Sequence, residues 1–230
     1  MNKSKIKYFL LIFAFIITSG ALFFWKQTKA GNSLIYLENK NYDLQIGLQD
    51  LYLTSSADVV MLGNSLTYNV NWSELLNRKN VVNRGIISDI TQGYLHRLDY
   101  VYKLKPKVCF IEGGINDLNA SFQVEAIFEN FVEIIKELKQ HNIIPVIQST
   151  ICVANYYPKA EERNVQVVEL NKKLSEYAKE NNIDFIDIKS LVTHNNFLMN
   201  KFTYDGLHLN AGGYKLWKPL VEKVLIKYKL

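Results

Sequence analysis

Residues 59–67 have the sequence VVMLGNSLT, in which four apolar residues precede Gly63 and the polar residues Asn64 and Ser65 follow it. A short Val-rich run that is apolar throughout is typical of a parallel strand covered on both faces. Glycine and asparagine directly after such a run favour a turn. The stretch therefore predicts a buried strand over Val59–Leu62, followed by a sharp turn that presents Asn64 and Ser65.

Four further apolar runs follow along the chain and alternate with longer amphipathic segments. Alternation of this kind predicts β-α-β units with right-handed crossovers, and therefore an α/β fold around a five-stranded parallel sheet. We expect residues 57–230 to form a single domain. The other strands are predicted at Val81–Asn83, Val108–Ile111, Ile143–Ile147 and Phe185–Ile188, and the helices at about Ile90–Lys103, Val124–Gln140, Val165–Asn181 and Gly213–Tyr228.

The charge of the chain is concentrated at its N-terminus. The 230 residues include 27 Lys and Arg and 22 Asp and Glu, for a net charge of +5. Five of the lysines lie in residues 1–30, which contain no acid, so residues 31–230 are formally neutral. A neutral domain lacks the basic surface that nucleic acid requires, and we expect no nucleic-acid partner.

The N-terminal segment predicts export. Tyr8 to Trp25 is an uncharged stretch whose length approaches that of a helix crossing a bilayer. Three lysines precede it, which favours an N-terminus in the cytoplasm. Residues 1–30 are interpreted as a signal anchor or as a signal peptide cut after Ser19-Gly20-Ala21, with a buried core helix as the third alternative. Both export readings place the remainder of the chain outside the cytoplasm, either anchored by the N-terminal hydrophobic helix or secreted.

Residues 31–56 are expected to form a polar stalk and then a leading helix. In that helix Leu44, Leu48, Leu51 and Tyr52 recur at helical spacing.

Neither cysteine nor short motifs indicate a cofactor. Cys109 lies early in one predicted strand and Cys152 just after the end of another, so the two thiols are expected near opposite ends of the sheet and unpaired. Their spacing is not that of a metal site. The chain contains no P-loop, no GxGxxG and no HExxH motif, and we expect neither a nucleotide nor a metal.

Polar residues gather in the loops that follow the strands. Ligands bind at the carboxyl ends of parallel strands, so these loops are expected to meet at one edge. Taken singly, each is explained by a helix cap, a turn or a structural histidine. Together they predict Ser65 as a nucleophile, His208 as its base and Asp205 as the group that orients the imidazole. The expected oxyanion donors are the amides of Ser65 and Gly85 and the side chain of Asn116.

Four blocks at these positions follow one another in order, and the chain thereby resembles the SGNH hydrolases, also called GDSL-type esterases and lipases. The resemblance covers about Asp58 to Leu225 and includes spacers similar to those of bacterial acylhydrolases and platelet-activating-factor acetylhydrolase-like esterases. It implies a flavodoxin-like three-layer α/β/α sandwich. The blocks are Val60–Thr67, Asn83–Gly85, Gly114–Asp117 and Asp205–Asn210.

Two residues depart from the family pattern. Asn64 stands where the family often has Asp, and Ser88 stands where it usually has a second glycine three residues after Gly85. Other polar residues near the predicted strands receive no catalytic role. His96, His141 and His194 are expected at the surface, and Glu112 is expected to make a structural hydrogen bond.

The function expected from these residues is serine ester hydrolysis. Export favours short acyl groups, such as acetyl, on carbohydrate or cell-wall glycan. The alternatives are a lysophospholipase or thioesterase that takes longer acyl chains, and a non-catalytic glycan-binding module on the same fold. Acyl transfer to an acceptor other than water uses the same residues.

The full-length protein is expected to fractionate with membranes and to resist extraction by high salt, because apolar insertion is not screened as surface charge is. N-terminal sequencing of the mature protein separates the two export readings. A start at Leu22 or Gly31 indicates a cleaved signal, and a start at Met1 or Asn2 indicates an anchor. A soluble cytosolic protein would contradict both.

Overall fold

The structure is a computed structural model that describes residues 35–230. The chain divides into two units, residues 1–38 and Asn39–Leu230. In the first unit the described part is a 3-10 helix, η1 (Ile35–Glu38). The predicted hydrophobic helix over Tyr8–Trp25 lies outside the described residues. Within residues 35–230, none of the helices combines the length and the apolar character that crossing a bilayer requires.

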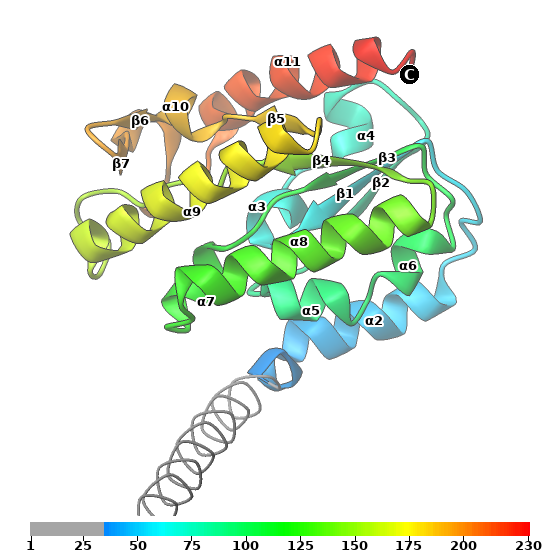
Figure 1. The fold of residues 1–230 in the computed structure, drawn as a ribbon, viewed down its shortest axis with the longest axis horizontal. Helices are drawn as coiled ribbons and strands as arrows, with labels where there is room; N and C mark the ends of the chain where they lie inside the picture. The colour runs from blue at the N-terminus through cyan, green and yellow to red at the C-terminus, as the bar shows by residue number, and fades with distance from the viewer. Residues whose placement is uncertain (1–34) are drawn as a thin grey trace, which may run out of the picture. The chain divides into compact units, whose positions relative to one another are not determined.

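The second unit contains the predicted five-stranded parallel sheet. Its order is β2-β1-β3-β4-β5, so the chain first moves to one side of β1 and then to the other (Figure 1). The carboxyl ends of β1, β2 and β3 are in register, with Gly63 beside Gly85 and Leu62 beside Ile111. The strands are β1 (Val59–Gly63), β2 (Val81–Gly85), β3 (Val108–Ile111), β4 (Ile144–Gln148) and β5 (Asp184–Ile186).

Helices cover both faces of the sheet. In Figure 1, α11 and α4 lie on one side of it, and α8, α5 and α6 lie on the other. A small antiparallel hairpin of β6 (Thr193–His194) and β7 (Phe197–Leu198), followed by the 3-10 helix η2 (Asn200–Phe202), precedes α11. The helices are α2 (Lys40–Leu51), α3 (Ser65–Tyr68), α4 (Trp72–Leu75), α5 (Thr91–Leu95), α6 (Asp99–Tyr102), α7 (Ile115–Asn119), α8 (Val124–Gln140), α9 (Ala160–Glu180), α10 (Lys189–Val192) and α11 (Ala211–Lys227).

The core follows from the alternation of side chains along the strands. Met61 and Phe110 point to the face where Trp72 of α4 and Trp217 of α11 pack edge to face, with ring centroids 5.0 Å apart. The strands themselves are buried throughout, as β1 shows from Val59 to Gly63. Burial on both faces explains why the strands appear in the sequence as continuous apolar runs.

Several predicted elements differ in part from the structure. The single helix expected over Ile90–Lys103 is two short helices, α5 and α6, separated at Arg97. Around the break the amides of Arg97 and Tyr100 bond three residues back instead of four. Arg97 is fully buried at the break, where its side chain turns toward the sheet. In α2 the expected apolar stripe is not the buried face, since Leu44 and Leu51 are 59% and 74% exposed.

The helix expected from Val165 begins at Ala160. Periodicity missed its first turn because that turn mixes acidic and polar residues with few apolar ones. The buried face runs through Ala160, Val167, Leu170 and Leu174, whereas Val165 is 68% exposed.

The prediction of unpaired core thiols is confirmed, because Cys109 and Cys152 are both free and buried. Burial raises the pKa of each thiol to about 12, which keeps them protonated and unreactive.

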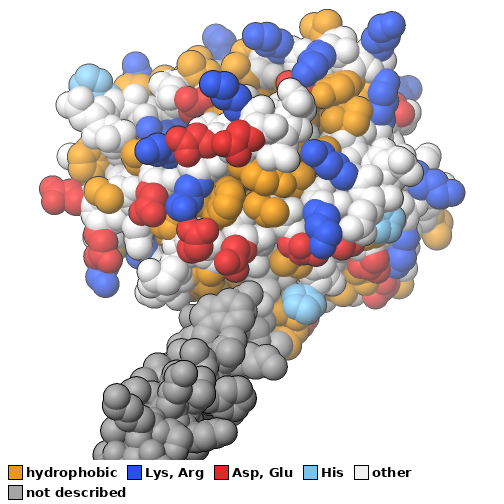
Figure 2. All heavy atoms as spheres, viewed as in Figure 1, with side chains coloured by type: hydrophobic (Ala, Val, Ile, Leu, Met, Phe, Trp, Pro, Cys, Tyr) orange, Lys and Arg blue, Asp and Glu red, His pale blue; other side chains and the backbone are white. Residues whose placement is uncertain are grey.

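Charges of both signs are interspersed over the face shown in Figure 2, with no gathering of one sign on that face. An ion pair of 2.7 Å between Lys173 and Glu125 joins α9 to α8. This distribution agrees with the formal neutrality of residues 31–230.

At Gly85 the backbone of α3 lies close against β2. A Cβ there would lie 2.4 Å from the Tyr68 amide nitrogen and 2.9 Å from the Asn64 carbonyl oxygen, both of them backbone atoms. We expect Gly85→Ala to destabilise the protein by about 1–3 kcal/mol in denaturant unfolding. The matched control is Gly47→Ala in α2, where a Cβ meets nothing within 4 Å and helix propensity predicts a gain of roughly 0.5–1 kcal/mol. A Gly85→Ala protein as stable as wild type would contradict the packing.

Candidate active site

The turn after β1 presents Ser65 at the carboxyl edge of the sheet. Asn64 caps α3, with its Oδ1 accepting a hydrogen bond from the Leu66 amide at 2.8 Å. Gly63 is required before it, since a Cβ there would lie 2.1 Å from the Thr67 hydroxyl oxygen. Ser65 is thus the first residue of a helix that starts directly from the strand, a position where a serine hydroxyl is exposed to substrate.

The structure brings the three predicted triad residues together. Ser65 Oγ lies 2.9 Å from His208 Nε2, and His208 Nδ1 lies 2.5 Å from Asp205 Oδ2. The protonated Nδ1 donates to the carboxylate, which leaves Nε2 free to accept the serine proton. Ser65 is 6% exposed, and the side chains of His208 and Asp205 are 22% and 38% exposed. The hydrogen bonds of the triad are therefore partly shielded from water, and the side chains remain accessible to a substrate.

The loop that carries Asp205 and His208 is held by its own backbone. The second carboxylate oxygen of Asp205 accepts hydrogen bonds from the amides of Leu207, at 2.9 Å, and His208, at 2.7 Å. Thr203 donates its hydroxyl to the His208 carbonyl at 2.7 Å. Gly206 turns the chain at a φ of +89°, a conformation that favours glycine.

Asp205 is ionised at neutral pH. Burial alone would raise the pKa of this carboxyl, but hydrogen bonds from the His208 ring and from the His208 and Leu207 amides outweigh burial and lower it. A carboxylate that accepts three hydrogen bonds fixes both the charge and the orientation of the imidazole beside it.

The three predicted oxyanion donors have different surroundings. The Ser65 amide has no hydrogen-bond partner within the described residues, as expected at the first position of a helix. Asn116 Nδ2 donates one hydrogen bond to the Asp89 carbonyl at 2.9 Å, and its second N–H has no acceptor among the described residues. The Gly85 amide, in contrast, donates to Asn83 Oδ1 at 2.7 Å, so the structure does not leave this predicted donor free.

Asn83 in the second block and Ser88 in the loop after it change the interpretation of this region. The side-chain Nδ2 of Asn83 donates hydrogen bonds to the carbonyls of Thr67 and Val70 and so connects the end of α3 to β2. Ser88 has a φ of +59°, the left-handed region that glycine adopts more easily. No partner of the Ser88 amide is found among residues 35–230. The sequence signal was the family glycine that Ser88 replaces.

Glu112 is a buried acid directly behind the site. By distance, neither carboxylate oxygen has a hydrogen-bond partner in the described part of the chain, whereas the electrostatics of Glu112 includes a side-chain hydrogen bond with Asn64, so the expected structural hydrogen bond stays a prediction. Burial raises the pKa of Glu112 to about 8, against a smaller opposing effect of the neighbouring Asn64 side chain. At neutral pH the side chain is therefore mostly the neutral acid.

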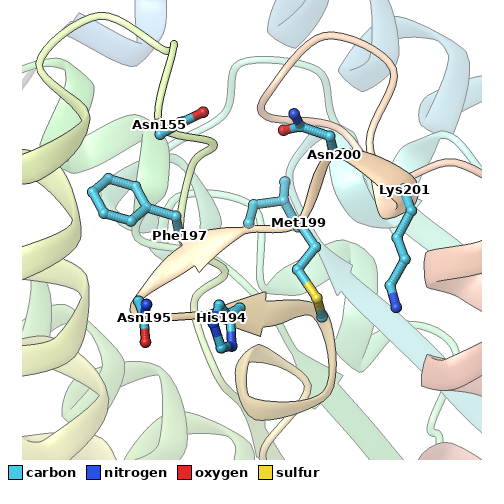
Figure 3. A pocket seen from close by; sticks show the side chains of 8 residues that line it. Asn155, His194, Asn195, Phe197, Met199, Asn200 and Lys201 are labelled. Carbon is cyan, nitrogen blue, oxygen red and sulfur yellow. The ribbon is translucent and has the colours of Figure 1, made fainter.

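The histidines expected at the surface are all exposed. His141 stacks on Tyr102 with ring centroids 3.6 Å apart, and His96 lies at the end of α5. His194 lines a hollow of about 550 Å³ over the β6–β7 hairpin, together with Asn155, Phe197 and Met199 (Figure 3). No triad residue lines this hollow. Within residues 35–230, no three His, Cys, Asp or Glu side chains are arranged to hold a metal ion.

The match to known proteins agrees with this geometry. Residues 61–216, more than half of the chain, match the GDSL-like Lipase/Acylhydrolase family. The chain therefore belongs to this family.

Individual relatives differ in how much of their length they share. An N-acylneuraminate cytidylyltransferase from Streptococcus agalactiae is 27% identical over 195 residues, which are 84% of this chain but only 43% of that protein. The chain thus spans less than half the length of this curated relative. Among solved structures, a GDSL-like lipase from Bacteroides thetaiotaomicron has a TM-score of 0.72 at 23% identity, over 82% of this chain and 98% of its own. An acetyl xylan esterase has a TM-score of 0.63 at 18% identity, over 73% and 98%.

The raised pKa of Glu112 predicts a pH-dependent stability. From its ordinary pKa of 4.5 up to about 8, the unfolded chain releases this proton while the folded protein keeps it. The Glu112 proton should therefore remove up to ~1.4 kcal/mol of wild-type stability per pH unit across that window, and Glu112→Gln should lack this contribution. Denaturant unfolding at pH 4, 6 and 8 should show the advantage of the variant growing with pH. Exposed Glu169→Gln is the control, and parallel pH slopes for Glu112→Gln and wild type would contradict the assignment.

Proposed function

We propose that the protein hydrolyses short acyl esters of carbohydrate through Ser65, His208 and Asp205. The observation that carries the proposal is the continuous hydrogen-bonded chain from Ser65 Oγ through His208 to Asp205. His208 accepts the proton as Ser65 attacks the acyl carbonyl, and Asp205 stabilises the imidazolium that forms. His208 then donates the proton to the leaving alcohol, and a water molecule activated by the same imidazole releases the acyl group.

The oxyanion of the tetrahedral intermediate needs donors that are free before the reaction. The Ser65 amide and the second hydrogen of Asn116 Nδ2 meet this condition. Gly85 could donate only after its bond to Asn83 opened. We therefore assign the third donor to the free amide of Ser88, in the same loop and next to Asp89, whose carbonyl holds Asn116.

Two observations support a sugar as the alcohol. Tyr204 stacks on His208 with ring centroids 5.8 Å apart and is 65% exposed, and Tyr156 is 57% exposed beside Gly206 of the same loop. An exposed tyrosine offers an apolar ring face and a hydroxyl, which suits the mixed surface of a sugar ring. Two proteins similar to this chain are also named for sugar substrates, N-acylneuraminate and acetyl xylan.

Export would place this site among extracytoplasmic glycans. That part of the proposal rests on residues 1–30, with three lysines before an uncharged stretch of 18 residues, Tyr8 to Trp25. A lysophospholipase or thioesterase acting on longer chains remains the second candidate, since the triad chemistry is the same.

A series of p-nitrophenyl esters from acetyl to palmitoyl tests the proposal. We expect the full-length protein to turn over acetyl and butyryl esters fastest. Ser65→Ala should reduce kcat by at least ~10³-fold without loss of stability, because the triad acts as a unit. An optimum at long chains would favour the second candidate. No turnover at any length would favour the non-catalytic glycan-binding module.

A further inference from the structure

Arg97 is a fully buried cation behind the catalytic edge, at the break between α5 and α6. Its guanidinium makes three hydrogen bonds to separate acceptors. Nη1 donates to the Arg84 carbonyl at 2.7 Å, Nη2 to the Gly63 carbonyl at 3.1 Å, and Nε to Asp89 Oδ2 at 2.8 Å. The Tyr94 ring lies 5.1 Å from the guanidinium carbon and packs against it. The cation is thus held in one orientation.

Each of the three acceptors belongs to a segment that supplies the site. Gly63 ends β1 and lies two residues before Ser65. The Arg84 carbonyl is part of the peptide unit that leads into Gly85 and the loop up to Ser88. Asp89 follows that loop, and its carbonyl accepts the hydrogen bond that orients Asn116. One planar group therefore connects the nucleophile turn, the loop after β2 and, through Asp89, the side chain of Asn116.

The chemistry of the group explains why an arginine stands there. A guanidinium is rigid and planar, with donors at fixed angles, so the positions of its three acceptors are coupled. A lysine ammonium has no such fork. A buried ion pair such as Arg97–Asp89 is weak evidence for added stability, because desolvation offsets much of the attraction. What the arginine adds without such an offset is a defined spacing between backbone segments.

We propose that Arg97 is a positioning residue that fixes the oxyanion hole. It does so by binding the Gly63 and Arg84 carbonyls and the side chain of Asp89, whose own carbonyl orients Asn116. The inference rests on the proposed esterase function and adds a residue that does not touch substrate. Because catalysis depends on donors aimed at the transition-state oxygen, a shift of less than 1 Å in their spacing should lower kcat more than substrate binding.

The test compares Arg97→Lys, Arg97→Met and the double variant Asp89→Asn/Arg97→Met with wild type, all as full-length protein. Three quantities are measured: kcat and KM for p-nitrophenyl acetate, and the inhibition constant of an alkylboronic acid, which forms a tetrahedral adduct with the serine. We expect kcat to fall roughly 10- to 100-fold with KM within about threefold, and boronate affinity to fall in parallel with kcat. Arg97→Lys should not restore the rate.

Leu225→Ala is the matched control. Leu225 is fully buried in the last turns of α11, away from the triad loops, so its truncation destabilises the protein without touching the site. Its kcat should equal that of wild type at a temperature where both are folded.

The outcomes separate this inference from the proposed function. An active wild type with Arg97 variants that are folded and equally fast would overturn the positioning role. So would a loss of kcat with unchanged boronate affinity. If none of the three variants folded, the hydrogen bonds of the Arg97 guanidinium would be required for folding, and the inference would be wrong. A wild type without esterase activity would overturn the proposed function itself.

Discussion

The hydrogen bond between Ser65 Oγ and His208 Nε2 joins residues 143 positions apart, and its 2.9 Å length depends on most of the domain. Ser65 is placed by β1 and by the turn at Gly63, while His208 is placed by the loop that precedes α11. Tyr214 of α11 links the two directly, since its hydroxyl donates to the Leu66 carbonyl in α3 at 2.6 Å. Parallel strands bring such distant segments to one edge, and the packing of α11 against the sheet fixes the distance.

Behind this edge the fold buries polar groups that an apolar core would avoid. Asp117 accepts hydrogen bonds from the amide and hydroxyl of Thr91, and Arg97 joins Asp89. Burial raises the pKa of Asp117 and of Asp89 to about 6, despite the hydrogen bonds that favour their charged forms. Such networks give conformational definition more than net stability. Their location directly beneath the catalytic loops is consistent with a requirement for fixed geometry there.

Much of the fold was predictable because its strands are buried on both faces and appear as apolar runs. The triad was predictable because Ser65, Asp205 and His208 lie in the loops at strand ends or before the last helix. Helical periodicity failed at Arg97, since a charged residue in an amphipathic segment gives no sign that it points inward. It failed in α2 because Leu44 and Leu51 are exposed. The occupied Gly85 amide depends on the rotamer of Asn83, which only coordinates reveal.

The central claim is that His208 and Asp205 activate Ser65 as a nucleophile, and covalent labelling tests it most directly. A p-nitrophenyl alkylphosphonate transfers its phosphonyl group to an activated serine and releases nitrophenol. Intact-mass measurement and peptide mapping of the full-length protein should show one adduct, located on Ser65, and His208→Ala should abolish it. An adduct on any other residue, or labelling of Ser65 that does not depend on His208, would contradict the account.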